Sequence, residues 1–226
     1  MRTFFKEFFD YSEVWALLIP LFFLVRRKSP LPSHLKPIKI YVIIGLLINI
    51  GIILIWKRNK LGIDLPDTLH SNNFLYNFFS IVRLYLFSWF FISLGQRFMH
   101  RVKIFIPIAF TIFFLINFIF YEDFFNYWML SSRLLATESA LLLFFCLQYF
   151  FFLLLEDRPA SLRKYPGFWV VAGLSIYMAV SFFVFLFFNY MIKNNIQFAI
   201  SIWDVHNVAF IIFCIFIARA FSTKYE

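Results

Sequence analysis

Charge is what this sequence has least of. Lys, Arg, Asp and Glu together make up 15% of 226 residues, against about a quarter in a typical soluble domain. Hydrophobic residues account for 62% and aromatic residues for 24%, with Phe alone at 37 positions. A chain with so little polar surface cannot cover itself in water. This excludes a soluble enzyme, a DNA-binding domain and a disordered tail, and it predicts that much of the surface faces lipid.

Residues that bind metals or act as nucleophiles are also scarce. Cys146 and Cys214 lie in separate apolar runs without a CxxC pair, so we interpret both as packing residues. Of four histidines, only His206 falls inside an apolar segment, which is too few for a three-histidine zinc site. There is no GxSxG motif. We therefore predict no metal and no cofactor, and an enzyme is disfavoured, although Glu138 and His206 could supply acid–base chemistry.

Seven apolar segments approach the roughly 20 residues that a membrane-spanning helix needs. They cover residues 9–25, 38–56, 74–94, 104–121, 130–155, 168–190 and 196–221. The first is the weakest, because Asp10 and Glu13 lie at its start and Pro20 lies inside it. The linkers are short, carry Pro and Gly, and cannot house a further domain. We predict an all-α polytopic membrane bundle of seven transmembrane helices, forming a single domain over residues 1–226.

Basic residues are divided unequally between the two ends of this bundle. Thirteen fall at one end: Arg26, Arg27, Lys28, Lys36, Lys39, Arg97, Arg101, Lys103, Arg158, Arg163, Lys164, Arg219 and Lys224. Six fall at the other: Arg2, Lys6, Lys57, Arg58, Lys60 and Lys193. Since Lys and Arg accumulate in cytoplasmic loops, we expect the N-terminus outside and the C-terminus in the cytoplasm of a cell membrane, with a bacterial inner membrane as the compartment. This orientation accounts for the net charge of +9 without a nucleic-acid partner.

Polar side chains recur at one depth in several segments. Counted from the outer ends of their segments, the ionisable ones lie about 12–15 Å deep at about 1.5 Å per residue. These are Arg83, Glu138, Asp204 and His206, and Asn49, Ser181 and Asn207 lie near that depth. Each ionisable residue at this depth costs about 2.5–3.5 kcal/mol to insert, so the layer requires an explanation.

The charges of this layer balance if Arg83 and Arg133 are set against Glu138 and Asp204. We therefore expect Arg83 to pair with Glu138, Asp204 or both, because an unpaired buried charge is costly. Asp204 and His206 are two residues apart on a helix, so only one of them can face the same pocket. The layer is either packing between helices, at about 0.6 kcal/mol per contact, or a site for a ligand, a proton or sensing.

The last apolar segment differs from that of one known class of seven-helix proteins and resembles that of another. Rhodopsin-like photoreceptors carry a retinal-binding lysine there, whereas this chain reads WDVHN. The segment IWDVHNVAFIIFCIFIARAF resembles the last helix of uncharacterised seven-helix integral membrane proteins of Bacteroidota, at Trp203, His206 and Asn207. The resemblance covers about 20 residues and the helix count, and it implies a signalling context.

Two functions remain open on the sequence alone. The first is a sensor or accessory signalling component that acts with a separate membrane or cytoplasmic partner, because the chain carries no output domain. The second is a small-molecule or ion transporter or channel using the same charged layer. Transporters commonly show internal repeats and channels rings of equivalent groups, and neither is visible, so we favour sensing. The expected partners are the lipid bilayer and this separate signalling partner, and an oligomer is compatible with the sequence.

Overall fold

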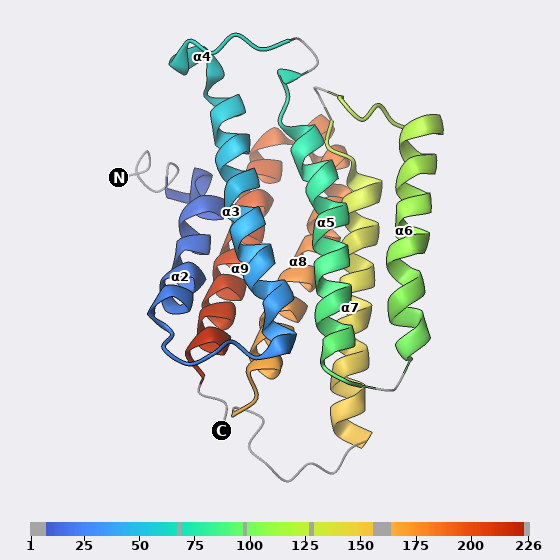
Figure 1. The fold of residues 1–226 in the computed structure, drawn as a ribbon. Helices are drawn as coiled ribbons and strands as arrows, with labels where there is room; N and C mark the ends of the chain where they lie inside the picture. Colours follow the sequence, from blue (N-terminus) through green and yellow to red (C-terminus); the bar gives the residue numbers. More distant parts are fainter. Residues whose placement is uncertain (1–7, 67–68, 97–98, 127–128, 156–163, 224–226) are drawn as a thin grey trace.

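The computed structural model describes residues 8–66, 69–96, 99–126, 129–155 and 164–223 (Figure 1). Within these ranges the chain is helical and has no β-strand. The elements are α2 (Ser12–Arg26), the 3-10 turn η1 (Ser33–Leu35), α3 (Lys36–Trp56), α4 (Arg58–Leu61), α5 (Asn73–Ser93), α6 (His100–Phe120), α7 (Ser132–Leu155), α8 (Pro166–Asn194) and α9 (Ile196–Ser222). The predicted all-α class is confirmed.

Six of these helices are long and apolar enough to cross a membrane: α3 together with η1, α5, α6, α7, α8 and α9. Their ends agree with the sequence prediction to within four residues, the largest differences being at the start of α6 and the end of α8. Six such helices are the architecture of a multi-pass membrane protein.

The first predicted segment forms a helix, but a short one. α2 has 15 residues and is therefore about 22 Å long, less than the roughly 30 Å of a bilayer's hydrocarbon core. It packs against α9 and α3 and covers only part of the height of the bundle (Figure 1). Pro20 lies inside it and is buried. The structure thus has six candidate spans plus a shorter helix on their flank.

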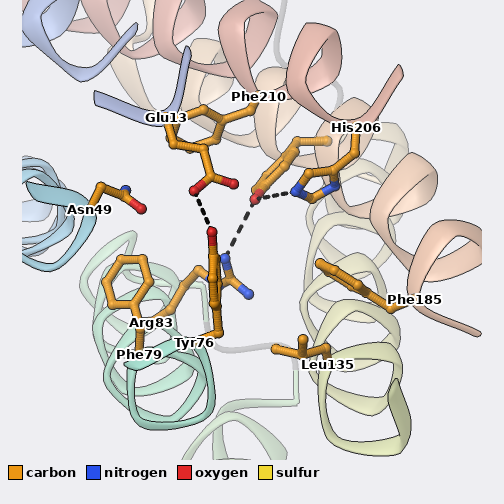
Figure 2. A pocket seen from close by; sticks show the side chains of 10 residues that line it. Glu13, Asn49, Tyr76, Phe79, Arg83, Leu135, Phe185, His206 and Phe210 are labelled. Carbon is orange, nitrogen blue, oxygen red and sulfur yellow. Dashed lines mark hydrogen bonds between the residues drawn. The ribbon is translucent and has the colours of Figure 1, made fainter. Parts of the chain in front are cut away.

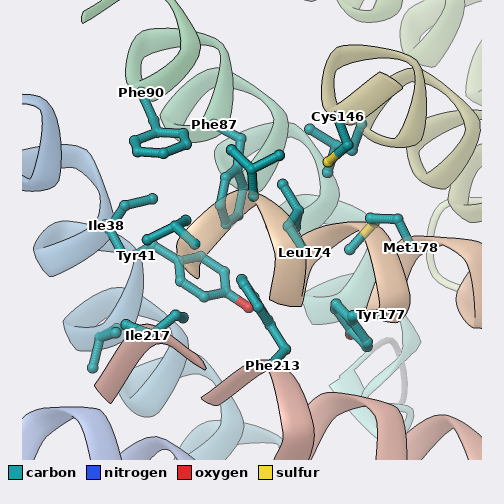
Figure 3. Close-up of a cluster of buried hydrophobic side chains, with 14 of the residues drawn as sticks. Ile38, Tyr41, Phe87, Phe90, Cys146, Leu174, Tyr177, Met178, Phe213 and Ile217 are labelled. Carbon is teal, nitrogen blue, oxygen red and sulfur yellow. The ribbon is translucent and has the colours of Figure 1, made fainter. Parts of the chain in front are cut away.

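An aromatic core holds the bundle together (Figure 3). Tyr41 of α3, Phe87 of α5 and Phe213 of α9 meet with ring centroids 5.0–6.0 Å apart. Helix α8 lies between α7 and α9. A Cβ built on Gly173 of α8 would come within 2.6 Å of Phe216 Cβ on α9. This position needs glycine because the two helices approach so closely there.

The described basic residues of the larger group lie toward one end of the bundle, where α2 joins α3, α5 approaches α6, and α9 ends (Figure 1). Arg27 from the α2–α3 connection donates from Nη1 to the carbonyl oxygens of Phe221 (2.6 Å) and Thr223 (3.1 Å). It thereby satisfies carbonyl groups that the end of α9 leaves without helical partners. We call this the basic end. Six counted residues lie outside the described ranges: Arg2, Lys6, Arg97, Arg158, Arg163 and Lys224.

Candidate functional site: a buried ion pair below a polar pocket

Arg83 of α5 and Glu138 of α7 form a two-pronged ion pair inside the bundle. Arg83 Nε donates to Glu138 Oε1 at 2.5 Å, and Arg83 Nη2 donates to Oε2 at 2.6 Å. Their side chains are 8% and 0% exposed. Parallel charge-assisted hydrogen bonds of this kind are the strongest that side chains form. The predicted pairing of Arg83 with Glu138 is confirmed.

A chain of polar contacts continues from the ion pair into α8 and α9. Arg83 Nη1 lies 3.5 Å from the hydroxyl of Tyr177, which lies 3.5 Å from His206 Nε2 (Figure 2). On its other side, His206 Nδ1 lies 3.2 Å from Ser181 Oγ, and that hydroxyl donates to the carbonyl oxygen of Tyr177 at 2.7 Å. One assignment satisfies every group: Nδ1 carries the proton and donates to Ser181, and Nε2 accepts from Tyr177. The contacts link three helices.

A second carboxylate approaches this layer from α2. The hydroxyl of Tyr76 on α5 donates to Glu13 Oε2 at 2.9 Å (Figure 2). Glu13 and Arg83 line the same small cavity, of about 20 Å³, together with Asn49, Tyr177 and His206. A space of that size accommodates one water molecule among polar partners. The site therefore combines one guanidinium with two carboxyl groups.

A larger pocket of about 180 Å³ lies beside this cavity and shares Glu13, Asn49 and Tyr76 with it. Its other walls come from the first turn of α5, the end of α3 and the first half of α9. Asn72, just before α5, and Trp56, at the end of α3, both line it. These residues place the pocket toward the end of the bundle opposite the basic end (Figure 1). We call it the outer pocket.

Toward the basic end, packed side chains close the site. Tyr41, Phe87, Phe213, Leu174 and Met178 are all buried and belong to one cluster with Tyr177 (Figure 3). Tyr177 stacks on Phe213 with ring centroids 5.5 Å apart and planes 10° apart. In this conformation the polar residues form a dead-end site with an aromatic floor.

The other residues of the predicted layer take different places. Asn49 and His206 are buried and line the small cavity, and Asn207 lines the outer pocket. Asp204 is half-buried and lines neither space, consistent with the expectation that only one of Asp204 and His206 faces inward. Arg133 is exposed, with its guanidinium 5.9 Å from the ring centroid of Tyr121. Glu13 brings a second carboxyl group to the small cavity, which neither Asp204 nor Arg133 lines.

Sequence reasoning missed three members of the site. Glu13 was interpreted as a weakness of the first segment, whereas α2 is short and begins at the depth of the layer. Tyr76 and Tyr177 were counted with the aromatic residues. A tyrosine inside a spanning segment is itself a signal, because its buried hydroxyl needs a polar partner.

The arrangement can bind and orient a polar group. Among the described residues, no three His, Cys, Asp or Glu side chains gather as metal ligands. Neither a known protein family, a curated protein nor a solved structure matches this chain. The chemistry of the site is therefore the basis for inferring its function.

Proposed function

We propose that this chain is a receptor-like membrane protein, a sensor or accessory signalling component. In this proposal, the outer pocket binds a small polar ligand and the bundle conveys its presence to a separate partner. The observation that carries the proposal is the dead-end pocket above the Arg83–Glu138 pair. A buried ion pair contributes little net stability compared with apolar packing, so its retention at the base of a pocket favours a binding role over a packing role.

The orientation belongs to the same proposal. Because Lys and Arg favour the cytoplasmic side, we place the basic end in the cytoplasm of a cell membrane, in bacteria the inner membrane, and the outer pocket on the opposite side. Residues 9–25 as a seventh span, with the N-terminus outside, stay a prediction. So does the resemblance of the last helix to seven-helix proteins of Bacteroidota, which would agree with a signalling partner at the basic end.

The contacts of the site suggest how a signal would travel. Glu13 is on α2, Arg83 on α5, and His206 on α9, so a ligand at the outer pocket touches or adjoins three helices. At the basic end, Arg27 ties the end of α2 to the last turn of α9. A shift of α2 against α9 would move this contact and the basic residues beside it.

A transporter using the same charged layer is the second candidate. The aromatic floor weighs against it, since a pathway would have to open between Tyr41, Phe87 and Phe213. We would reconstitute the wild type and Glu138→Gln in proteoliposomes and measure the flux of protons, rubidium and choline. The receptor proposal predicts no flux above empty liposomes with either protein. A wild-type flux that disappears in Glu138→Gln, but persists in an Asp64→Asn control from the exposed α4–α5 connection, would overturn it.

A further inference from the structure

We infer that the outer pocket binds a small organic ammonium group, with Glu13 as its counter-charge. This inference rests on the proposed function, because it names the class of ligand for the same pocket. It depends on three observations on the described residues: a carboxyl group with no cationic side chain as its partner there, aromatic rings in the wall, and a buried amide oxygen with no hydrogen-bond partner in the same part of the chain.

The charge of the site favours a cation. Arg83 directs two of its nitrogens to Glu138 and a third to Tyr177. Glu13 accepts its hydrogen bond from the neutral hydroxyl of Tyr76. The described residues that line the outer pocket include two acids, Asp10 and Glu13, and no Lys, Arg or His. Arg83 is paired with Glu138, so a cationic ligand beside Glu13 would stabilise the ionised form of that carboxyl group and balance its charge.

Aromatic rings supply the second feature. Tyr76 and Trp203 line the pocket and meet edge to face, with centroids 6.3 Å apart and planes at 88°. Trp56 lines it as well. Lys57, which does not line the pocket, has its Nζ 6.0 Å from the ring centroid of Trp56 and 4.5 Å from that of Tyr11. Faces of Trp and Tyr attract ammonium groups, and such rings recur around quaternary ammonium ligands.

Asn207 supplies the third feature. It lines the pocket, is 3% exposed, and donates from Nδ2 to the carbonyl oxygen of Phe9 at 3.3 Å. Its Oδ1 has no hydrogen-bond partner among the described residues. A buried acceptor without a partner carries a desolvation cost that a donor or cation can relieve. Asn207 is therefore placed to accept a hydrogen bond from a ligand in the pocket.

Size and lining together select an organic cation over a metal ion. The volume of about 180 Å³ is about nine times the 20 Å³ of the one-water cavity, which suits a ligand with a few heavy atoms beyond nitrogen. Metal ions such as Ca²⁺ and Mg²⁺ require shells of six or more oxygens. Here Ile52, Ile53 and Trp56 occupy part of the wall. Choline is a fitting probe for this class.

The test is binding of radiolabelled choline to the purified full chain in phosphatidylglycerol nanodiscs at constant ionic strength. We expect saturable binding, with dimethylbutanol, in which carbon replaces the nitrogen, competing at least about tenfold more weakly. Glu13→Gln should weaken binding by about 30-fold or more, the loss typical when one partner of a buried charge pair is removed. Gln keeps an acceptor for Tyr76. Asp64→Asn, an exposed acid outside the pocket, should bind as the wild type does.

A second pair of variants distinguishes a loss of choline binding from a loss of folding. Trp56 is 56% exposed, so Trp56→Leu should leave the thermal unfolding temperature unchanged and weaken choline binding about threefold to tenfold. Trp89→Leu, at an exposed position of α5 outside the pocket, should change neither. Absence of saturable choline binding, equal competition by dimethylbutanol, or unchanged binding in a folded Glu13→Gln protein would each overturn the inference. The proposed function would instead fail by showing flux.

The ammonium can come from a free solute or from a lipid headgroup, and the nanodiscs distinguish these sources. If phosphatidylethanolamine in place of part of the phosphatidylglycerol suppresses choline binding, the headgroup is the ligand. If choline binding is unaffected, the ligand is a free solute. Both results agree with an ammonium site at Glu13, and the comparison of the two nanodisc compositions identifies the source of the ammonium group.

Discussion

Replacing Arg83 with Leu should destabilise the protein strongly, because it leaves the carboxylate of Glu138 buried without its partner. The pair has two contacts, at 2.5 and 2.6 Å, and Glu138 has a fully buried side chain. Removing one partner of a buried pair typically costs about 3–5 kcal/mol. The loss of the contact between Arg83 and Tyr177 adds to this. We expect the loss in the free energy of unfolding caused by Arg83→Leu to lie in the upper part of this range.

A second substitution should restore much of that loss. In Arg83→Leu with Glu138→Gln, no buried charge remains from the pair, so the double variant should be more stable than Arg83→Leu alone. Adding Asp204→Asn should bring no further recovery, since Asp204 does not line the cavity around Arg83. Arg133→Leu is the matched control. Arg133 is exposed, so its removal should change the free energy of unfolding by less than about 0.5 kcal/mol.

The assay is reversible unfolding of these four variants, the Glu138→Gln single variant and the wild type in one detergent, followed by circular dichroism. The wild type, Arg83→Leu, Glu138→Gln and the variant with both substitutions form a double-mutant cycle. The cycle should give a coupling free energy of about 2 kcal/mol or more between Arg83 and Glu138. Additive effects of the two substitutions would refute the reasoning, as would an Arg83→Leu protein as stable as Arg133→Leu. The contact would then be an incidental one between groups stabilised elsewhere.

Two further predictions concern packing and orientation. Gly173→Ala should destabilise the contact of α8 with α9, because its Cβ would lie 2.6 Å from Phe216 Cβ. Gly51→Ala, whose Cβ would have its nearest neighbour 3.5 Å away, should be tolerated. Thermal unfolding of both variants checks this, and equal melting temperatures would contradict it. A fluorescent-protein reporter inserted at Lys28 should fold and fluoresce in the cytoplasm, and an alkaline phosphatase inserted at Gly62 should be active outside; the reverse pattern would contradict the orientation.

The helices could be predicted because each depends on its own composition. Long apolar runs bounded by Pro, Gly and charged linkers located α3, α5, α6, α7, α8 and α9 to within a few residues. The first segment was harder, because its length in the membrane depends on how α3 and α9 pack beside it. The run from Phe9 to Val25 is apolar enough for either a span or a flanking helix, and composition alone does not decide between them.

The site could be predicted in part. Equal depth and opposite sign limited the partner of Arg83 to Glu138, Asp204 or both, because buried charges need partners whatever the fold. Depth says nothing about the direction in which a side chain points around its helix, so Arg133 was included although it faces outward. Glu13 was left out because it was placed at the start of a span, whereas the short helix α2 brings it to the depth of the layer. Which helices are neighbours has to come from the structure.

The central claim is that the polar site opens to one side of the membrane only. Its most direct test is the reaction of single introduced cysteines with a charged, membrane-impermeant thiol reagent. Cys146 and Cys214 are buried, at 0% exposure, so the native protein should give no background. Asn72→Cys and Asn49→Cys, in the outer pocket, should react only when the reagent is applied from the side opposite the basic end. Reaction of Asn49→Cys from the basic end, or from both sides, would contradict the account.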